Sequence, residues 1–175
     1  TNDENPLQIK IFEGNQMITN LYDSNWYPKN VVVWNKVYKK EVFKGIRYAK
    51  GFNHEDELIF TDLYSKDFKV VYTSRKLLYY RIREESIMSN IYSVTNLQSK
   101  KELYSKRKLF FADQYSELQK YNRIKYSYYI ASGMLNSNAK LFKPFLNAEI
   151  IKYVLGNKEL HWKSKILFIV KLLKP

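Results

Sequence analysis

The chain has 175 residues, of which 45% are hydrophobic and 27% are charged, a composition typical of a folded globular protein. Cysteine is absent, which excludes a disulfide-bonded scaffold, a thiolate metal site and a cysteine nucleophile. No apolar run approaches the ~20 residues that a membrane-spanning helix needs, so we expect no transmembrane segment.

The net charge of +13 is concentrated in the second half of the chain. Residues 89–175 contain 16 Lys/Arg and 5 Asp/Glu, a net charge of +11, whereas residues 1–88 contain 14 and 12, a net charge of +2. A basic segment attracts phosphate groups, whether of nucleic acid, anionic lipid or nucleotide. The abundance of Lys, Asn, Tyr and Ile would also follow from an AT-rich genome, so composition leaves binding and codon bias as alternatives.

Short strands and helices alternate in the first half. The pattern predicts a strand at 9–12 and a helix at 13–23 with apolar residues at helical spacing, then a loop at 24–30 that contains Pro28. The other elements expected here are an extended segment at 31–33, a short helix at 38–44 ended by Gly45, an amphipathic helix at 55–66, and strands at 69–72 and 76–82.

Beyond Met88 the pattern predicts helices alone. We therefore expect an α+β fold in two parts, with a mixed region at 1–90 and a helical region at 91–175. The helices expected in the second part are 96–119, 123–136, a helix from the capping residue Asn147 to Leu155 that Gly156 stops, and 161–173.

An acidic cluster, Glu55-Asp56-Glu57, lies where the loop after Gly51 becomes a helix. One interpretation is structural: Asn53 caps the helix, Asp56 forms the reciprocal half of the capping arrangement, and acidic residues favour a helix N-terminus. The other is catalytic: a carboxylate held at the edge of a cleft can take a proton from a hydroxyl group. The two are compatible, because one residue can cap while its neighbour reacts.

The residues on either side of this cluster also have two interpretations. Trp34 is either a core aromatic or a wall for a sugar or acceptor, and Lys36 is either a solvated lysine or an electrostatic partner of Asp56 or a phosphate. Arg81 and Arg83 alternate on the expected strand and share a face, with Ser86 in the loop that follows. That pair either protects a sheet edge or binds a diphosphate.

Three segments in order carry a resemblance to a known family. Trp-Asn-Lys-Val-Tyr-Lys-Lys-Glu-Val-Phe (34–43), Gly-x-x-His-Glu-Asp-Glu (51–57) and Leu-Tyr-Tyr-Arg-Ile-Arg-Glu-Glu-Ser-Ile-Met (78–88) together resemble the second half of family 2 glycosyltransferases, enzymes with the A-type fold. The resemblance covers about residues 13–90. It implies that Asp56 or Glu55 is the catalytic base, and that the substrate-binding residues are Trp34, Lys36, Arg81, Arg83 and Ser86.

The resemblance implies transfer of a sugar from a nucleotide-sugar donor to a hydroxyl of a glycan or lipid-linked acceptor, in bacterial surface polysaccharide synthesis. Such enzymes carry an earlier donor-binding half, whose Asp-x-Asp motif holds Mg²⁺ or Mn²⁺. No such motif precedes Val31. We therefore expect the acceptor-side part of an A-type fold followed by a helical bundle, inactive alone and without a metal site of its own. We also expect a cytoplasmic location.

The main alternative function is non-enzymatic. A helical region of net charge +11 with many tyrosines could bind nucleic acid or another anionic partner by charge and stacking. We do not expect nucleic acid binding, because the aromatic spacing is that of a helix interior and no nucleic-acid motif is present.

Residues 161–173 form a separate candidate surface. Trp162, Ile166, Ile169, Val170 and Leu173 share one face of the expected helix, and lysines lie largely on the other side. This apolar face either packs against the tyrosine-rich helix at 123–136 or lies on the inner face of an anionic membrane.

Overall fold

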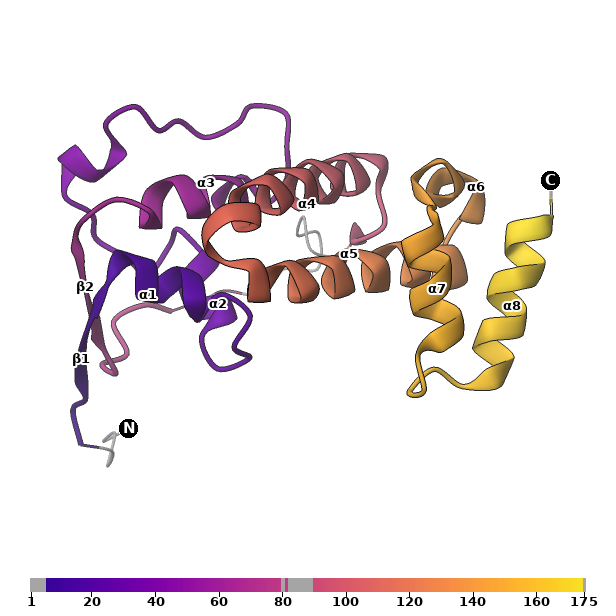
Figure 1. The fold of residues 1–175 in the computed structure, drawn as a ribbon. Helices are drawn as coiled ribbons and strands as arrows, with labels where there is room; N and C mark the ends of the chain where they lie inside the picture. Colours follow the sequence, from indigo (N-terminus) through magenta and orange to yellow (C-terminus); the bar gives the residue numbers. More distant parts are fainter. Residues whose placement is uncertain (1–5, 80, 82–89, 175) are drawn as a thin grey trace. The chain divides into compact units, whose positions relative to one another are not determined.

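The computed structural model describes residues 6–79, 81 and 90–174 (Figure 1). The chain divides into two compact units, Thr1–Ser89 and Asn90–Pro175. The first contains a small sheet with short helices, and the described part of the second contains helices and connecting turns. The fold is therefore α+β with helices predominating, as expected.

Two strands form an antiparallel sheet in the first unit. Strand β1 (Ile9–Glu13) pairs with β2 (Lys69–Thr73) in a register that joins Ile9 to Thr73. Both strands were predicted, and both are confirmed. Their pairing was not predicted, because it joins segments far apart in the sequence.

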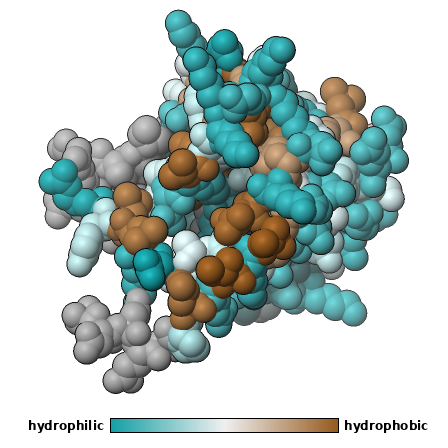
Figure 2. Space-filling view, turned by 90° about the vertical axis from the view of Figure 1, so that its left-hand side faces the viewer, coloured by the Kyte–Doolittle hydropathy of each residue, from teal (hydrophilic) through white to brown (hydrophobic). Residues whose placement is uncertain are grey.

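The two faces of this sheet differ. On one face Phe12 and Tyr72 pack edge-on against Trp26, each with a ring-centroid distance of 5.1 Å. The opposite face carries the exposed side chains of Ile9, Ile11 and Val71. Figure 2 views the side on which β1 and β2 lie in Figure 1, and hydrophobic side chains are visible there among hydrophilic ones.

Helix α3 (Glu55–Tyr64) supplies a large part of the first unit's core, with Leu58, Ile59, Phe60 and Leu63 buried. It confirms the predicted amphipathic helix. Helix α1 (Gly14–Thr19) starts against the end of α3, where a Cβ on Gly14 would lie 2.8 Å from the carbonyl oxygen of Tyr64. Glycine is therefore required at the start of α1.

Several local predictions for the first unit need correction. The predicted loop 24–30 contains a short helix, α2 (Tyr27–Val31), because Pro28 lies in its first turn, where a proline fits. Val31 accordingly ends a helix, and only Val32 after it is extended. The helix expected at 38–44 is a shorter 3-10 helix, η1 (Lys40–Phe43), followed by Gly45 at φ 79°.

The strand expected at 76–82 is wrong over its described residues, 76–79 and 81, which have no regular structure. Leu77, Leu78 and Tyr79 are exposed. Alternation alone does not make a strand, because each strand needs a neighbour to satisfy its backbone hydrogen bonds, and β2 pairs with β1.

The second unit begins with a helical hairpin, α4 (Val94–Gln114) and α5 (Ser116–Asn136). The single long helix expected at 96–119 is therefore wrong, because the chain reverses at Tyr115. The antiparallel pair is held by the stacked rings of Tyr104 and Tyr126, 4.3 Å apart, and by Asn122 Nδ2, which donates to the Tyr104 carbonyl at 3.1 Å. Helical periodicity continues on both sides of Tyr115, so the sequence did not reveal the turn.

Short helices complete the second unit: α6 (Ala139–Phe142), the 3-10 helix η3 (Lys143–Phe145), α7 (Ala148–Gly156) and α8 (Trp162–Leu173). Asn147 caps α7 as predicted, since its Oδ1 accepts from the Ile150 N–H at 2.9 Å. His161 likewise precedes α8, and its Nδ1 accepts from the Lys163 N–H at 3.3 Å.

A hydrophobic core joins helices α4 to α8. Gly133 on α5 makes room for Phe142, since a Cβ at Gly133 would come within 2.1 Å of the Phe142 ring. The buried core residues are Leu97, Tyr126, Ile130, Ala131, Met134, Phe142, Ile150, Val154 and Phe168. Among the described residues, none of the helices has the length and apolar character needed to cross a membrane.

Candidate functional site

The acidic cluster lies at the first turn of α3 and follows two residues with positive φ. Gly51 has φ 83° and His54 has φ 58°. The helix begins after His54, whose carbonyl accepts from the Leu58 N–H at 3.2 Å. The capping position is His54, one residue after the predicted Asn53, and the His54 side chain makes no capping hydrogen bond.

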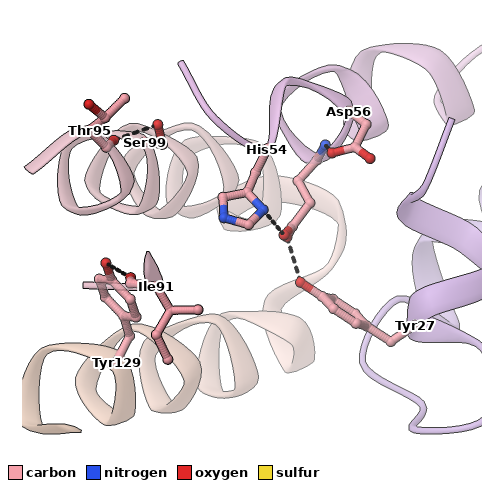
Figure 3. Close-up of polar contacts among 8 residues, drawn as sticks. Tyr27, His54, Asp56, Ile91, Thr95, Ser99 and Tyr129 are labelled. Carbon is pink, nitrogen blue, oxygen red and sulfur yellow. Dashed lines mark hydrogen bonds and ion pairs between the residues drawn. The ribbon is translucent and has the colours of Figure 1, made fainter. Parts of the chain in front are cut away.

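Glu57 anchors this turn to the rest of the first unit through Tyr27 and His54, the two partners labelled in Figure 3. Its side chain is buried, and its Oε2 accepts a short hydrogen bond from the Tyr27 hydroxyl on α2. Its Oε1 lies 3.7 Å from His54 Nδ1. Glu57 is thus the structural member of the cluster, a role that the sequence did not reveal because Tyr27 lies on another helix.

Asp56 is partly buried, and its Oδ1 accepts from the Glu57 backbone N–H at 2.8 Å. Burial raises the pKa of the Asp56 carboxyl above its usual range, and the negative charges of Glu57 and Glu55 raise it further. The Glu57 N–H and His54 act in the opposite direction. The ionised carboxylate is therefore held at a cost in free energy and is a stronger base than an exposed aspartate.

Lys36 is a partly buried lysine whose pKa responds to the charge of Asp56. Burial lowers the Lys36 pKa to about 8, and the Asp56 carboxylate opposes that shift. The Lys36 ammonium also donates to the Val32 carbonyl. This lysine follows Asn35, a residue with φ 65°, so a left-handed turn precedes it in the chain.

Tyrosines add hydroxyl groups to the surroundings of Asp56. Burial raises the pKa of Tyr38 and of Tyr48, and the Asp56 charge raises both further. Tyr38 also hydrogen-bonds with Tyr64 of α3. These phenols therefore stay protonated at neutral pH and remain able to donate. Sequence reasoning missed them, although Tyr38 lies within the first family-like segment.

The other predicted site residues have different outcomes. Trp34 is 44% exposed, so the interpretation as a core aromatic is wrong. Arg81 is exposed and lies outside any strand, so the alternation argument for a shared face with Arg83 no longer holds. Arg83 and Ser86 lie outside the described residues, and their roles stay predictions.

A metal site does not fit the described residues. None of their His, Asp and Glu side chains form a group of three or more that could hold a metal ion. A hollow of about 410 Å³ lies at the other end of α3 from Asp56, lined by Glu13, Gly14, Asn15, Ser65, Lys66 and Asp67. Lys66, the lysine that lines this hollow, already donates from its Nζ to the carbonyls of Val42 and Lys44, both at 2.7 Å.

Comparison with known proteins identifies a partial similarity. Part of the chain is 29% identical over 80 residues to the glycosyltransferase GlyA of Streptococcus pneumoniae serotype 4. The aligned segment covers 45% of this chain but 12% of that protein, so the chain spans a small part of its relative. No protein-family model and no solved structure match the chain. The similarity supports a relationship to glycosyltransferases.

Proposed function

We propose that this chain is part of a glycosyltransferase and that its first unit supplies the acceptor side of the active site. The reaction would transfer a sugar from a nucleotide-sugar donor to a hydroxyl of a glycan or lipid-linked acceptor. We further propose a cytoplasmic location and a role in bacterial surface polysaccharide synthesis. The partial similarity to a glycosyltransferase and the order of the three family-like segments support this proposal.

The observation that carries the proposal is the environment of Asp56. Its carboxylate is partly buried at the start of α3, beside two other acids and within the field of Lys36. A partly buried carboxyl whose pKa is raised by burial and by neighbouring acids is typical of functional sites. As general base, Asp56 would take the proton of the acceptor hydroxyl as that oxygen attacks the sugar.

The neighbouring groups have distinct proposed roles. Lys36 would act as an electrostatic partner of Asp56, or would bind a phosphate of the donor. The exposed ring of Trp34 is available as a wall for a sugar or acceptor. Arg81, with Arg83 and Ser86, would bind the diphosphate leaving group. Glu55 remains the second candidate for the base.

The test is Asp56→Asn in a longer parent protein that has transferase activity. The amide keeps an oxygen for the Glu57 N–H but cannot take a proton, so turnover should fall by ~10²–10⁴. Asp67→Asn is the matched control, because it makes the same change at an exposed position of the same unit. Turnover in Asp56→Asn equal to that of the wild type would contradict the proposed base.

Stability separates catalysis from folding in the same variant. The folded pKa of Asp56 is raised, so its contribution to stability is present at low pH and is lost as pH rises through that pKa. Above that pKa the negative charge of Asp56 therefore lowers the stability of the fold. Asp56→Asn should leave the thermal midpoint unchanged or raise it, and a large decrease would indicate a structural role.

Ligand binding separates the proposal from the alternative of a basic binding module. Stabilisation of the parent protein by a nucleoside diphosphate supports the transferase, since a ligand that binds the native state raises the melting temperature. Salt-sensitive binding to random oligonucleotides, without that stabilisation, would favour the binding module.

A further inference from the structure

Helix α8 presents its larger apolar face to solvent. Phe168 is fully buried in the core of the second unit, and α8 lies against α5 on this side (Figure 1). The other side of the helix is exposed, with Trp162 at 60%, Ile166 at 51%, Ile169 at 39%, Val170 at 53% and Leu173 at 76%. The expectation that these five residues pack against α5 is therefore wrong.

Two lysines fix this orientation. Lys165 Nζ donates to the Leu155 carbonyl near the end of α7 at 2.9 Å, and Lys171 Nζ donates to the Leu135 carbonyl near the end of α5 at 2.8 Å. Both carbonyls belong to the last turn of a helix, where intrahelical partners are missing. Rotating α8 to turn the five apolar residues inward would break both hydrogen bonds and expose Phe168. These contacts therefore favour the orientation in which the five residues face solvent.

Charge identifies the kind of partner. Helix α8 contains three lysines and no acid, and the one acid of the preceding turn, Glu159, is next to Lys158. The second unit has a net charge of +11. A second copy of the chain would bring two strongly basic surfaces together, which is unfavourable, whereas an anionic lipid surface is complementary in charge and accepts apolar side chains.

The geometry suits a helix lying in the membrane plane. Twelve residues give a length of about 18 Å, which is too short to span a bilayer. Trp162 at the start of the face is a residue type favoured at membrane interfaces, and Lys163 and Lys174 are exposed and long enough to reach headgroups.

We propose that the exposed face of α8 docks on an anionic membrane surface, with Trp162, Ile166, Ile169, Val170 and Leu173 inserted among the lipids. The lysines at its edges contact the headgroups. This proposal is independent of the proposed transferase function, because it rests on the structure and charge of the second unit alone.

Vesicle flotation of the 175-residue chain tests the proposal. The chain should float with phosphatidylcholine vesicles that contain about 30% phosphatidylglycerol, and binding should fall by about tenfold or more without the anionic lipid or in about 0.5 M NaCl. Ile166→Ser/Val170→Ser should also reduce binding by about tenfold or more, because two inserted apolar side chains are lost.

The matched control is Val94→Ser/Leu109→Ser, which removes two similarly exposed apolar side chains from α4. It should bind vesicles like the wild type, and circular dichroism should show the same helicity for all three proteins. Absence of wild-type binding to anionic vesicles, or equal loss in both double variants, would overturn the proposal. A dimer in sedimentation that Ile166→Ser/Val170→Ser abolishes, without vesicle binding, would assign the face to a second copy instead.

Discussion

The two units of the chain place their polar groups differently. In the first unit, long irregular segments between short elements bring Lys36, Tyr38 and Tyr48 within electrostatic range of Asp56. In the second, nearly continuous helices surround an apolar core, and the charge of +11 lies on a scaffold that is regular almost throughout. Irregular backbone can aim several side chains at one point, whereas a helix distributes them around its axis. This difference is the basis on which we propose a catalytic role for the first unit and a docking surface on the second.

The largest effect should come from the core of the second unit. Phe142→Ala should lower the free energy of unfolding of that unit by ~3–5 kcal/mol, because it empties a fully buried site packed directly on Gly133. Urea unfolding followed by circular dichroism measures the loss. Leu109→Ala, at an exposed position of α4, is the control and should change little. A loss below ~1 kcal/mol for Phe142→Ala would mean that this core contributes little to stability.

A smaller effect should come from the anchor of the acidic turn. Tyr27→Phe removes the hydroxyl that donates to the buried Glu57 carboxylate, and a lost hydrogen bond to a charged group costs ~1.5–3 kcal/mol. Because Glu57 adjoins Asp56, this variant should reduce both stability and transfer in an active parent protein.

The control for this anchor is Tyr79→Phe, which removes a hydroxyl at a fully exposed position of the same unit. It should change neither property. A Tyr27→Phe protein that loses stability but retains full turnover would show that the anchor does not position Asp56, and the link between the two residues would then be purely structural.

The smallest effect should come from a helix cap in the second unit. Asn147→Ala removes the acceptor for the Ile150 N–H and should cost about 1 kcal/mol, whereas Asn147→Asp keeps an acceptor and should cost much less. Thermal melts of the two variants measure the difference. Equal losses of stability in the two variants would show that the capping hydrogen bond is not the source of the effect. We expect both variants to keep wild-type turnover in an active parent protein, since the proposed catalytic residues lie in the first unit.

Local interactions explain what the sequence alone determined. The start of α7 was predicted from the capping residue Asn147, and the end of η1 from Gly45, which has φ 79°. The body of α3 was predicted from its apolar residues. Caps, turns and periodicity all act between residues a few positions apart. The strands β1 and β2 were also predicted from their own residues. The candidate Asp56 and its partner Lys36 also came from the sequence, through the order of the family-like segments.

Tertiary structure alone decided the rest. The pairing of β1 with β2, the hydrogen bond from Tyr27 to Glu57 and the reversal at Tyr115 each depend on contacts between segments that the sequence separates. Helix α8 shows the reason most clearly. Its pattern marks an apolar face, but Phe168 lies inside and Trp162 outside, with Lys165 and Lys171 bonded to the carbonyls of Leu155 and Leu135. Amphipathic periodicity identifies the faces of a helix, and only the shape and polarity of its neighbours decide which face is buried.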